Sequence, residues 1–453
     1  MNALFFDRAL LPQGWASDVA VDIADGVIRN IAPGAARERR EPIAGIALPG
    51  LANIHSHAFQ RAMAGLAEIR GPENDSFWTW RHVMYRFLER LTPDDVEAIA
   101  AFAYMQMLEA GFTAVVEFHY LHHDPAGRPY SDLAEMSGRI ASAAAESGIG
   151  LTLLPSLYAH STFGGAPPLP EQRRFLNDRE RFLKLVEGAG KAAATVPDAA
   201  LGIAPHSLRA VTPDMLREVI AAAPPGPIHI HAAEQLKEVE DCIAWSGRRP
   251  VEWLLDEMSL DRHWCVVHAT HMTEAETRAL AASGAVAGLC PLTEANLGDG
   301  IFDAVRFLAA GGEFGIGTDS NIEITASGEL KQLEYAQRLK WRARNVLAPK
   351  EGASTGCRLY EMALRGGALA SGRRIGGLTV GNRADIVVLE KTHPDLASNG
   401  SDHWLDAYLF VAGSTAVKTI IVGGRPVVEQ GRHRARDRIR SRYAAALKRI
   451  AEA

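Results

Sequence analysis

Eight short apolar runs, separated by helical patterns, recur between about residue 48 and residue 320. Each run ends in, or is followed at once by, a polar side chain with reactive chemistry. Short continuous apolar runs that alternate with helices are typical of buried parallel strands. Eight such units within about 270 residues predict an α/β fold of one kind, a (β/α)8 TIM-like barrel. The runs are LPGLANIH from Leu48, TAVVEF from Thr113, GLTLLPSL from Gly150, LGIAPH from Leu201, PIHIHA from Pro227, WCVVHA from Trp264, AVAGLC from Ala285 and EFGIGTD from Glu313.

One intervening helix can be delimited closely. Thr92 is a good N-cap, Pro93 fits the first helical position, and Asp95 adds a favourable negative charge to the first turn. Gly111 ends the periodic pattern, so we expect a helix between the first and second strands. The segment 59–91 before this helix is a long βα-loop, and such loops usually build the substrate pocket of a barrel.

The two ends of the chain follow a different pattern. They carry strand alternation with Asp-Gly and Gly-Gly turns and without intervening helices. We therefore expect residues 1–47 and 375–435 to form one small β-sandwich domain that flanks a barrel over residues 48–374. Residues 436–453 have the pattern of a charged amphipathic helix, which suits a surface or a subunit contact.

The composition places the chain among globular proteins. Of its 453 residues, 47% are hydrophobic and 23% are charged, with a net charge of -6 that argues against nucleic acid or an anionic membrane as the main partner. We find neither a signal-peptide pattern nor an apolar run of about 18 residues. The four cysteines lie far apart without a C-x-x-C pair, as in reducing compartments. We expect a cytoplasmic protein.

Several predicted strands end in potential metal ligands. His55 and His57 alternate on the first strand and so share one face. His231 and His268 end the fifth and sixth strands, and Asp319 ends the eighth. Because reactive groups of a barrel lie at the C-terminal ends of its strands, these side chains meet at one rim. Three histidines with one carboxylate suit a divalent ion such as Zn2+, with water completing the shell.

The roles of two residues near His231 can be interpreted in more than one way. His229 would share the face of His231, but it lies deeper in the strand, so we expect it to be structural. Glu234 follows the strand end, where its carboxylate can accept a proton from metal-bound water and pass it on. A solvated glutamate at the start of the charged helix AEQLKEVEDC is the alternative for Glu234.

These motifs together resemble the amidohydrolase superfamily. The carriers are HSH on the first strand, HAAE on the fifth, VVHAT on the sixth and GIGTDS on the eighth, and the outer segments resemble the small β-domain of that superfamily. The fourth strand ends in APHS, without a lysine to bridge two metals, and so resembles the mononuclear deaminases. HSHAFQRAMAGLAE and FWTWRHVMYRF resemble the formimidoylglutamate deiminases, which convert N-formimino-L-glutamate to N-formyl-L-glutamate and ammonia in histidine degradation.

The resemblance implies a role for each residue of the site. It implies one Zn2+ per subunit, with Fe2+ as the alternative, and a homodimer. Glu234 would be the general acid and base, His268 would orient or polarise the attacking hydroxide, and Asp319 would help to hold it. The metal ligands would be His55, His57, His231 and Asp319, and the substrate contacts would be Gln60, Arg81, Tyr120, His206 and Arg209.

The chemistry of the residues agrees with a small dianionic substrate. Arg81 in the first loop and Arg209 after the fourth strand each suit a carboxylate. The nearest alternative is an aminohydrolase of the same fold that acts on a purine, a pterin or S-adenosylhomocysteine, because Phe77, Trp78 and Trp80 can stack on a heterocycle. A noncatalytic barrel is the alternative from another class, although such relatives usually lose their metal ligands.

A further group of histidines follows the second strand. His119, His122 and His123 invite a second metal site. Histidines spread along a polar loop are usually solvated, so we expect these three side chains to lie in water.

Overall fold

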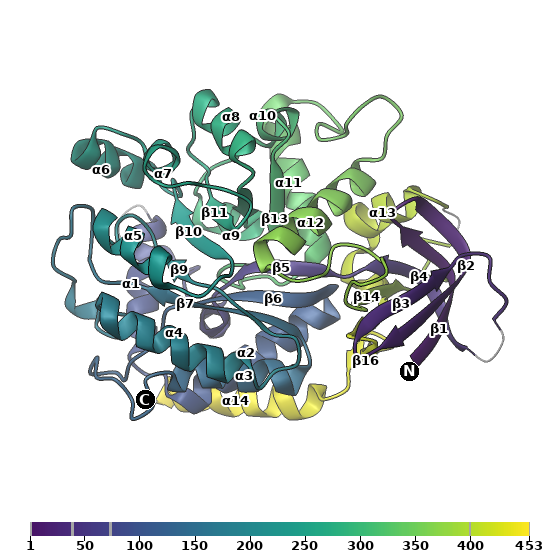
Figure 1. Cartoon of the computed structure of the whole chain (residues 1–453), viewed down its shortest axis with the longest axis horizontal. Coiled ribbons are helices and arrows are strands. Elements are labelled where there is room, and N and C mark those ends of the chain that lie inside the picture. The colour runs from purple at the N-terminus through teal and green to yellow at the C-terminus, as the bar shows by residue number, and fades with distance from the viewer. Residues whose placement is uncertain (1, 38–39, 72–74, 398–399, 453) are drawn as a thin grey trace.

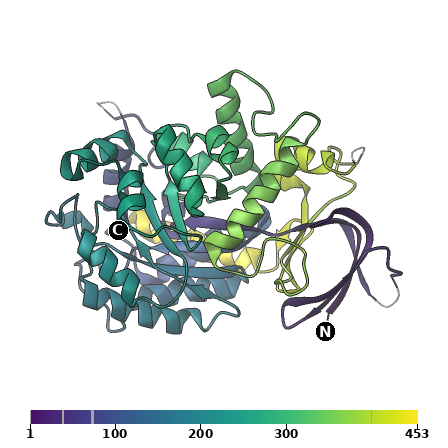
Figure 2. The same ribbon diagram turned by 45° about the horizontal axis from the view of Figure 1, so that its top comes forward.

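The computed structural model describes residues 2–37, 40–71, 75–397 and 400–452. Parallel strands form a barrel that helices surround, and a small β-domain stands beside it in both views (Figure 1, Figure 2). None of the helices in these ranges is long and apolar enough to cross a membrane.

The predicted barrel is confirmed. Its strands run in the order β10-β11-β12-β13-β5-β6-β7-β8, with β9 paired to β7. Single bridges from Ile203 to Ile228 and from Ser207 to His231 link the β9 region to β10 and close the ring. The strands are β5 (Leu51–Ser56), β6 (Phe112–His119), β7 (Gly150–Leu157), β8 (Ala200–Leu201), β9 (Ala204–Pro205), β10 (Ile228–Ala232), β11 (Trp264–His268), β12 (Val286–Leu289) and β13 (Glu313–Ile316).

Helices and single turns connect and cover these strands. The α-helices are α1 (Phe77–Leu88), α2 (Pro93–Glu109), α3 (Glu135–Ser147), α4 (Arg179–Ala193), α5 (Pro213–Ala222), α6 (Leu236–Ser246), α7 (Pro250–Glu257), α8 (Glu274–Ser283), α9 (Pro291–Leu297), α10 (Ala304–Ala309), α11 (Ala326–Trp341), α12 (Thr355–Ser371), α13 (His403–Ala407) and α14 (Arg436–Glu452). Shorter elements are the 3-10 helices η1 (Ala58–Met63), η2 (Pro170–Gln172) and η4 (Gly413–Ala416) and the π-helix η3 (Tyr408–Ala412).

Helix α2 begins where the sequence predicts. The hydroxyl of Thr92 accepts a hydrogen bond from the Asp95 amide at 3.3 Å, and the Asp95 carboxylate accepts one from the Thr92 amide at 2.8 Å. This reciprocal capping satisfies two backbone donors at the helix start. Gly111 follows the helix with a φ of 102°, a conformation that favours glycine.

The strand pattern at both chain ends produces one small β-domain. Its strands follow the order β17-β16-β15-β14-β4-β1-β2-β3 in one continuous sheet, in which β1 and β4 are parallel. The end of β4 includes Leu48 and Pro49, which pair with β14, so the first barrel strand begins only at Leu51. The strands are β1 (Asn2–Leu11), β2 (Gly14–Ala24), β3 (Val27–Ala32), β4 (Glu41–Pro49), β14 (Ile386–Leu389), β15 (Val417–Val422), β16 (Arg425–Glu429) and β17 (Arg432–His433).

Helix α14 packs along α2 (Figure 1). The rings of Phe102 and Tyr443 stack with their centroids 4.0 Å apart. Arg442 contacts Glu97 at 2.8 Å and Glu146 at 2.6 Å, so this helix ties α2 to α3. Ala453, the last residue of the predicted helix, lies outside the described residues.

Candidate active site

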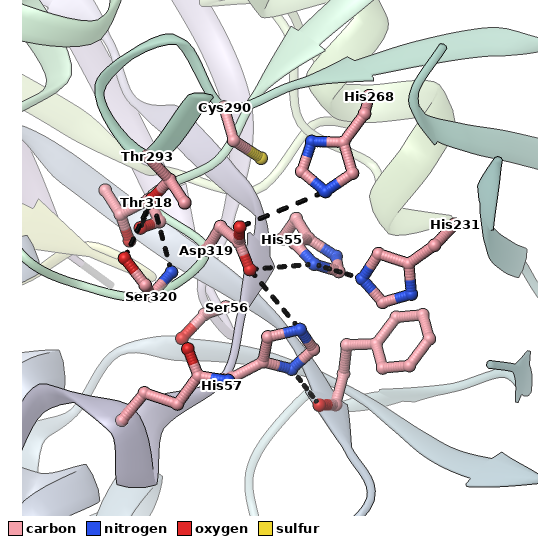
Figure 3. Close-up of polar contacts among 12 residues, drawn as sticks. His55, Ser56, His57, His231, His268, Cys290, Thr293, Thr318, Asp319 and Ser320 are labelled. Atoms are coloured by element: carbon pink, nitrogen blue, oxygen red, sulfur yellow. Dashed lines mark hydrogen bonds and ion pairs between the residues drawn. The ribbon is translucent and has the colours of Figure 1, made fainter. Parts of the chain in front are cut away.

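Three histidines and one aspartate converge at the carboxyl ends of the barrel strands (Figure 3). The Nε2 atoms of His55 and His57, both on β5, each lie 3.3 Å from Oδ1 of Asp319, which follows β13. Nε2 of His231 on β10 lies 3.1 Å from Nε2 of His55. All four side chains are buried, and their donor atoms lie within 4.8 Å of one another.

Hydrogen bonds to backbone carbonyls fix the inward orientation of two of these rings. Nδ1 of His57 donates to the Phe118 carbonyl at 2.8 Å, and Nδ1 of His231 donates to the His206 carbonyl at 2.9 Å. The proton on Nδ1 leaves the Nε2 lone pair of each ring pointing into the cluster. Burial lowers the pKa of both rings, and it lowers the pKa of His55 to about 3. Neutral imidazoles beside a carboxylate fit a divalent cation.

The loop that carries Asp319 is held in an uncommon backbone conformation. Asp319 has a φ of 44° and Asn321 a φ of 57°. The side-chain amide nitrogen of Asn321 donates to the carbonyls of Asp319 at 3.0 Å and His57 at 3.2 Å, and to the Ser56 hydroxyl at 3.2 Å. These bonds join the end of β5 to the loop after β13 and offset the cost of the positive φ. Sequence reasoning missed Asn321, whose sole signal is its place two residues after a ligand.

Glu234 and His268 lie beside the ligand cluster. Oε1 of Glu234 is 3.6 Å from Nε2 of His268, which is 4.0 Å from Oδ2 of Asp319. Nδ1 of His268 lies 3.2 Å from Oε1 of Glu294. Burial favours the neutral ring of His268, but the three surrounding carboxylates raise its pKa to about 10. Burial raises the pKa of Glu234 to about 7, against the opposing effects of His268 and Arg209.

One cavity collects nearly all the residues predicted for the site. His55 lies beneath the cavity floor, in contact with Asp319 and His231. Whether each residue has its predicted role stays a prediction, since the structure supplies only their positions. The predicted residues that line the cavity are His57, Gln60, Arg81, Tyr120, His206, Arg209, His231, Glu234, His268 and Asp319.

Two arginines converge on the same wall of the cavity. The guanidinium carbons of Arg81 and Arg209 lie 5.6 Å and 6.0 Å from the ring centre of Trp78. Nε of Arg81 donates to the Tyr85 hydroxyl at 2.6 Å. Nε of Arg209 is buried and has no hydrogen-bond partner among the described residues. Two guanidinium groups that line one cavity, one of them with an unpartnered buried donor, make a site for an anion.

Gln60 and Tyr120 form the side of the cavity between the metal ligands and helix α1. Nε2 of Gln60 donates to the Tyr120 hydroxyl at 2.8 Å. Oε1 of Gln60 is buried and accepts no hydrogen bond within the described part of the chain. The ring of His206 lies 5.5 Å from that of Tyr120 and 4.7 Å from that of Tyr158.

Sequence reasoning missed several residues of this wall. Tyr158 follows β7 directly and lines the cavity, and burial raises its pKa to about 12. Its position after a strand is the signal that could have found it. Met84 and Tyr85 on α1 and Phe175 after η2 belong to long connections between barrel strands. A local sequence pattern does not predict how these connections cross the barrel mouth.

The expectation that the histidines at the end of β6 and directly after it lie in water is wrong. His119, His122 and His123 are buried rather than solvated. The amides of His122 and His123 both donate to the Arg174 carbonyl at 3.0 Å, so the segment around Arg174 covers this loop. By contrast His229 lies below the site as expected, with its Nε2 2.8 Å from the Ala370 carbonyl on α12.

A fold of this type, with a buried cluster of metal ligands at the strand ends, defines a class of metal-dependent hydrolases. The model described as "Amidohydrolase family" matches residues 46–427, so the chain belongs to this family. A model described as "Formimidoylglutamate deiminase HutF, N-terminal domain" matches residues 1–41.

Individual relatives give a finer comparison. The chain is 53% identical over 440 residues to a formimidoylglutamate deiminase of Pseudomonas aeruginosa, with 97% of each chain covered. It is 29% identical over 394 residues to an 8-oxoguanine deaminase of the same organism, with 85% of this chain and 82% of the relative covered. A crystal structure described as an amidohydrolase from Brucella melitensis matches all of both chains with a TM-score of 0.95 and 53% identity.

Proposed function

We propose that the protein hydrolyses N-formimino-L-glutamate to N-formyl-L-glutamate and ammonia in histidine degradation. The observation that most supports the proposal is the position of Arg81 and Arg209. Both line one wall of the cavity, and the metal ligands form its floor. A substrate with two carboxylates at one end and an amidine-like carbon at the other matches this arrangement. The name of the 53% identical relative supports the same reaction.

His55, His57, His231 and Asp319 would hold one Zn2+, or Fe2+ as the alternative. The inward lone pairs and the buried carboxylate suit either ion. When bound, such a metal lowers the pKa of a coordinated water from about 15.7 to about 7 and so supplies a nucleophile at neutral pH.

Glu234 would move the protons of the reaction. It takes one proton from the attacking water, whose oxygen bonds to the formimino carbon. It gives this proton to the terminal nitrogen as the carbon–nitrogen double bond becomes single. It then passes the proton of the new hydroxyl group to the same nitrogen, so that a carbonyl forms while the carbon–nitrogen bond breaks and ammonia leaves. With a pKa of about 7, the Glu234 carboxyl group can both accept and donate a proton near neutral pH. His268 and Asp319 would orient the nucleophile, and Glu294 would hold the ring of His268 through Nδ1.

The remaining substrate contacts follow from the cavity walls. Arg81 and Arg209 would bind the two carboxylates. The free Oε1 of Gln60 would accept a hydrogen bond from a formimino N–H, with Tyr120 fixing the amide. His206, which burial keeps neutral by lowering its pKa, would line the same wall.

The test is ammonia release by the metal-loaded enzyme from formiminoglutamate, guanine, adenosine and S-adenosylhomocysteine. We expect rapid release from formiminoglutamate alone. Rapid turnover of a nucleobase with none of formiminoglutamate would establish the purine alternative, which the 8-oxoguanine deaminase relative and the aromatic residues Phe77 and Trp80 in the cavity favour. Against that alternative, two guanidiniums already occupy the neighbourhood of Trp78.

We infer three further properties of the molecule. It works in the cytoplasm, which the free state of all four cysteines supports. It forms a homodimer, which exposed apolar side chains on and beside α11 support: Leu339 is 79% exposed, Trp341 43% and Val411 64%. It binds a small dianionic substrate and binds neither nucleic acid nor a membrane.

A further inference from the structure

A second group of metal-binding side chains lies behind the proposed zinc ligands. His268 at the end of β11, Cys290 after β12 and Glu294 on α9 are all buried, with donor atoms within 4.8 Å of one another. Figure 3 shows the sulfur of Cys290 directed toward His268 and Asp319. The proposed reaction uses His268 and Glu294 but gives no role to this thiol.

We propose that His268, Cys290 and Glu294 form a second, inhibitory site for Zn2+ or Cd2+. Thiolate, imidazole and carboxylate are the donors that Zn2+ takes in proteins, and an ion that binds here displaces the protons of the Cys290 thiol and of the His268 ring. The sites are adjacent through Asp319: Oδ1 contacts His55 and His57, whereas Oδ2 is 4.0 Å from Nε2 of His268.

The existing contacts already hold the three ligands together. Oε1 of Glu294 accepts a hydrogen bond from the Cys290 amide at 2.9 Å and lies 3.2 Å from Nδ1 of His268. Cys290 is the N-cap of α9, and Pro291 begins that helix, so the backbone at the thiol is fixed. A site whose ligands are preorganised loses little conformational entropy when the ion binds.

Charge also favours a second cation. Two dications would be surrounded by four acidic groups, namely the carboxylates of Asp319, Glu234 and Glu294 and the thiolate of Cys290. A dication in this buried region is therefore neutralised by groups already present.

A metal ion in this site binds His268 and Glu294, so these side chains no longer orient the nucleophile. The arginine wall is unchanged, so the ion lowers kcat while KM for the substrate stays constant. Because soft thiolate ligands select Zn2+ and Cd2+ over Mg2+ and Mn2+, inhibition follows that order. The binding step itself does not depend on which substrate the enzyme hydrolyses.

The experiment uses holoenzyme that carries one equivalent of Zn2+, dialysed against increasing Cd2+. Bound metal and kcat are measured on the same samples for the wild type, Cys290→Ala and Cys242→Ala. Cys242 is a matched control, a buried thiol on α6 outside the cluster. We expect the wild type and Cys242→Ala to take up a second equivalent and lose kcat. Cys290→Ala should need at least about 10-fold more Cd2+ for either change.

The ultraviolet thiolate-to-cadmium absorption gives a second measurement, independent of catalysis and of the stability of the alanine variant. It should rise with the second equivalent in the wild type, and Cys290→Ser should lack it. No second equivalent in the wild type, or equal uptake and inhibition in Cys290→Ala, would overturn the proposal. Failure of formiminoglutamate as a substrate would leave the metal stoichiometry and the absorption unaffected.

Discussion

At the scale of single residues, Arg209 has the most specific proposed role in the cavity, which is to bind a carboxylate of the substrate. Its side chain is 8% exposed, its Nε has no hydrogen-bond partner in the described ranges, and its nearest carboxylate oxygen is 3.8 Å away on Glu234. A carboxylate of the substrate would satisfy these donors. Lysine keeps the charge but loses the planar pair of N–H groups.

The change Arg209→Lys should therefore raise KM for formiminoglutamate. A charge-assisted hydrogen bond contributes about 1.5–3 kcal/mol, so the expected rise is roughly 10- to 150-fold. Steady-state kinetics at equal metal content measure it. Arg217→Lys, in a surface pair with Glu257 2.7 Å away, is the control and should leave KM unchanged. An unaltered KM in Arg209→Lys would remove this arginine from the substrate site.

Glu117 on β6 gives a prediction about pH. It is fully buried, with one oxygen accepting from the Ala58 amide at 2.7 Å, and burial raises its pKa from 4.5 to about 8. Between these values the folded chain keeps a proton that the unfolded chain has lost. Its contribution to stability is therefore present at low pH and falls as pH rises, by up to about 1.4 kcal/mol per unit.

The change Glu117→Gln removes that proton linkage. We expect the Tm of the wild type to fall relative to that of Glu117→Gln as pH rises from about 5 to about 8. Thermal unfolding at several pH values, with the same metal content in both proteins, measures the difference. Parallel Tm curves would show that Glu117 is ionised in the folded protein.

Strand geometry predicted the metal ligands, and the family resemblance added substrate contacts on the loops, but other residues on the loops were missed. The alternation of His55 and His57, and the strand-end positions of His231 and Asp319, follow from the period of a β-strand. Asn321 and Phe175, which were missed, act through contacts between segments distant in sequence. No local pattern encodes such contacts, because they depend on how the loops cross the barrel mouth.

At the scale of elements, helix α1 carries one wall of the cavity and is held at its end by Arg174. This buried guanidinium donates to the carbonyls of Leu91 at 3.0 Å and His123 at 2.9 Å, and it also contacts the Leu88 carbonyl. It therefore ties the end of α1 to the loop after β6. The position of Arg81 on α1 depends on this attachment.

The change Arg174→Met keeps much of the side-chain volume and removes all donors. Each lost hydrogen bond contributes about 0.5–1.5 kcal/mol, so amide hydrogen exchange in α1 should become at least about 10-fold faster. KM should rise more than kcat falls, because α1 carries Arg81 but none of the metal ligands. Arg179→Met, in an exposed pair with Glu218, is the control. Unchanged exchange in α1 would mean that other contacts hold the helix.

Element boundaries show where the sequence pattern was incomplete. The apolar run from Leu201 is divided between two short strands, β8 and β9. Between them, the chain at Gly202 passes so close to Pro227 that a Cβ would lie 2.2 Å from its carbonyl oxygen. The run from Leu48 is shared between two sheets, with Gly50 between β4 and β5. Hydrophobicity locates such runs but does not assign them to a sheet.

At the scale of the whole molecule, the proposed metal links distant parts of the barrel. Its ligands come from β5, from β10 and from the loop after β13. An ion that binds only the folded chain stabilises it by about 4 kcal/mol at a concentration 1,000 times its Kd. Removal of the metal by a chelator should lower Tm and abolish ammonia release.

Readdition of Zn2+ or Fe2+ should restore both properties, whereas Mg2+ should restore neither because it prefers oxygen ligands. Differential scanning calorimetry and the ammonia assay on the same samples measure the two effects. A metal-free protein with full activity would contradict the proposed centre.

The proposed reaction depends above all on Glu234, which would move protons at a metal centre that hydrolyses formiminoglutamate. The most direct test measures metal content and ammonia release together in the wild type and Glu234→Gln. We predict equal metal content and a turnover about 100- to 10,000-fold lower in the variant. Full turnover of formiminoglutamate by Glu234→Gln, or its absence in the metal-loaded wild type, would contradict the claim.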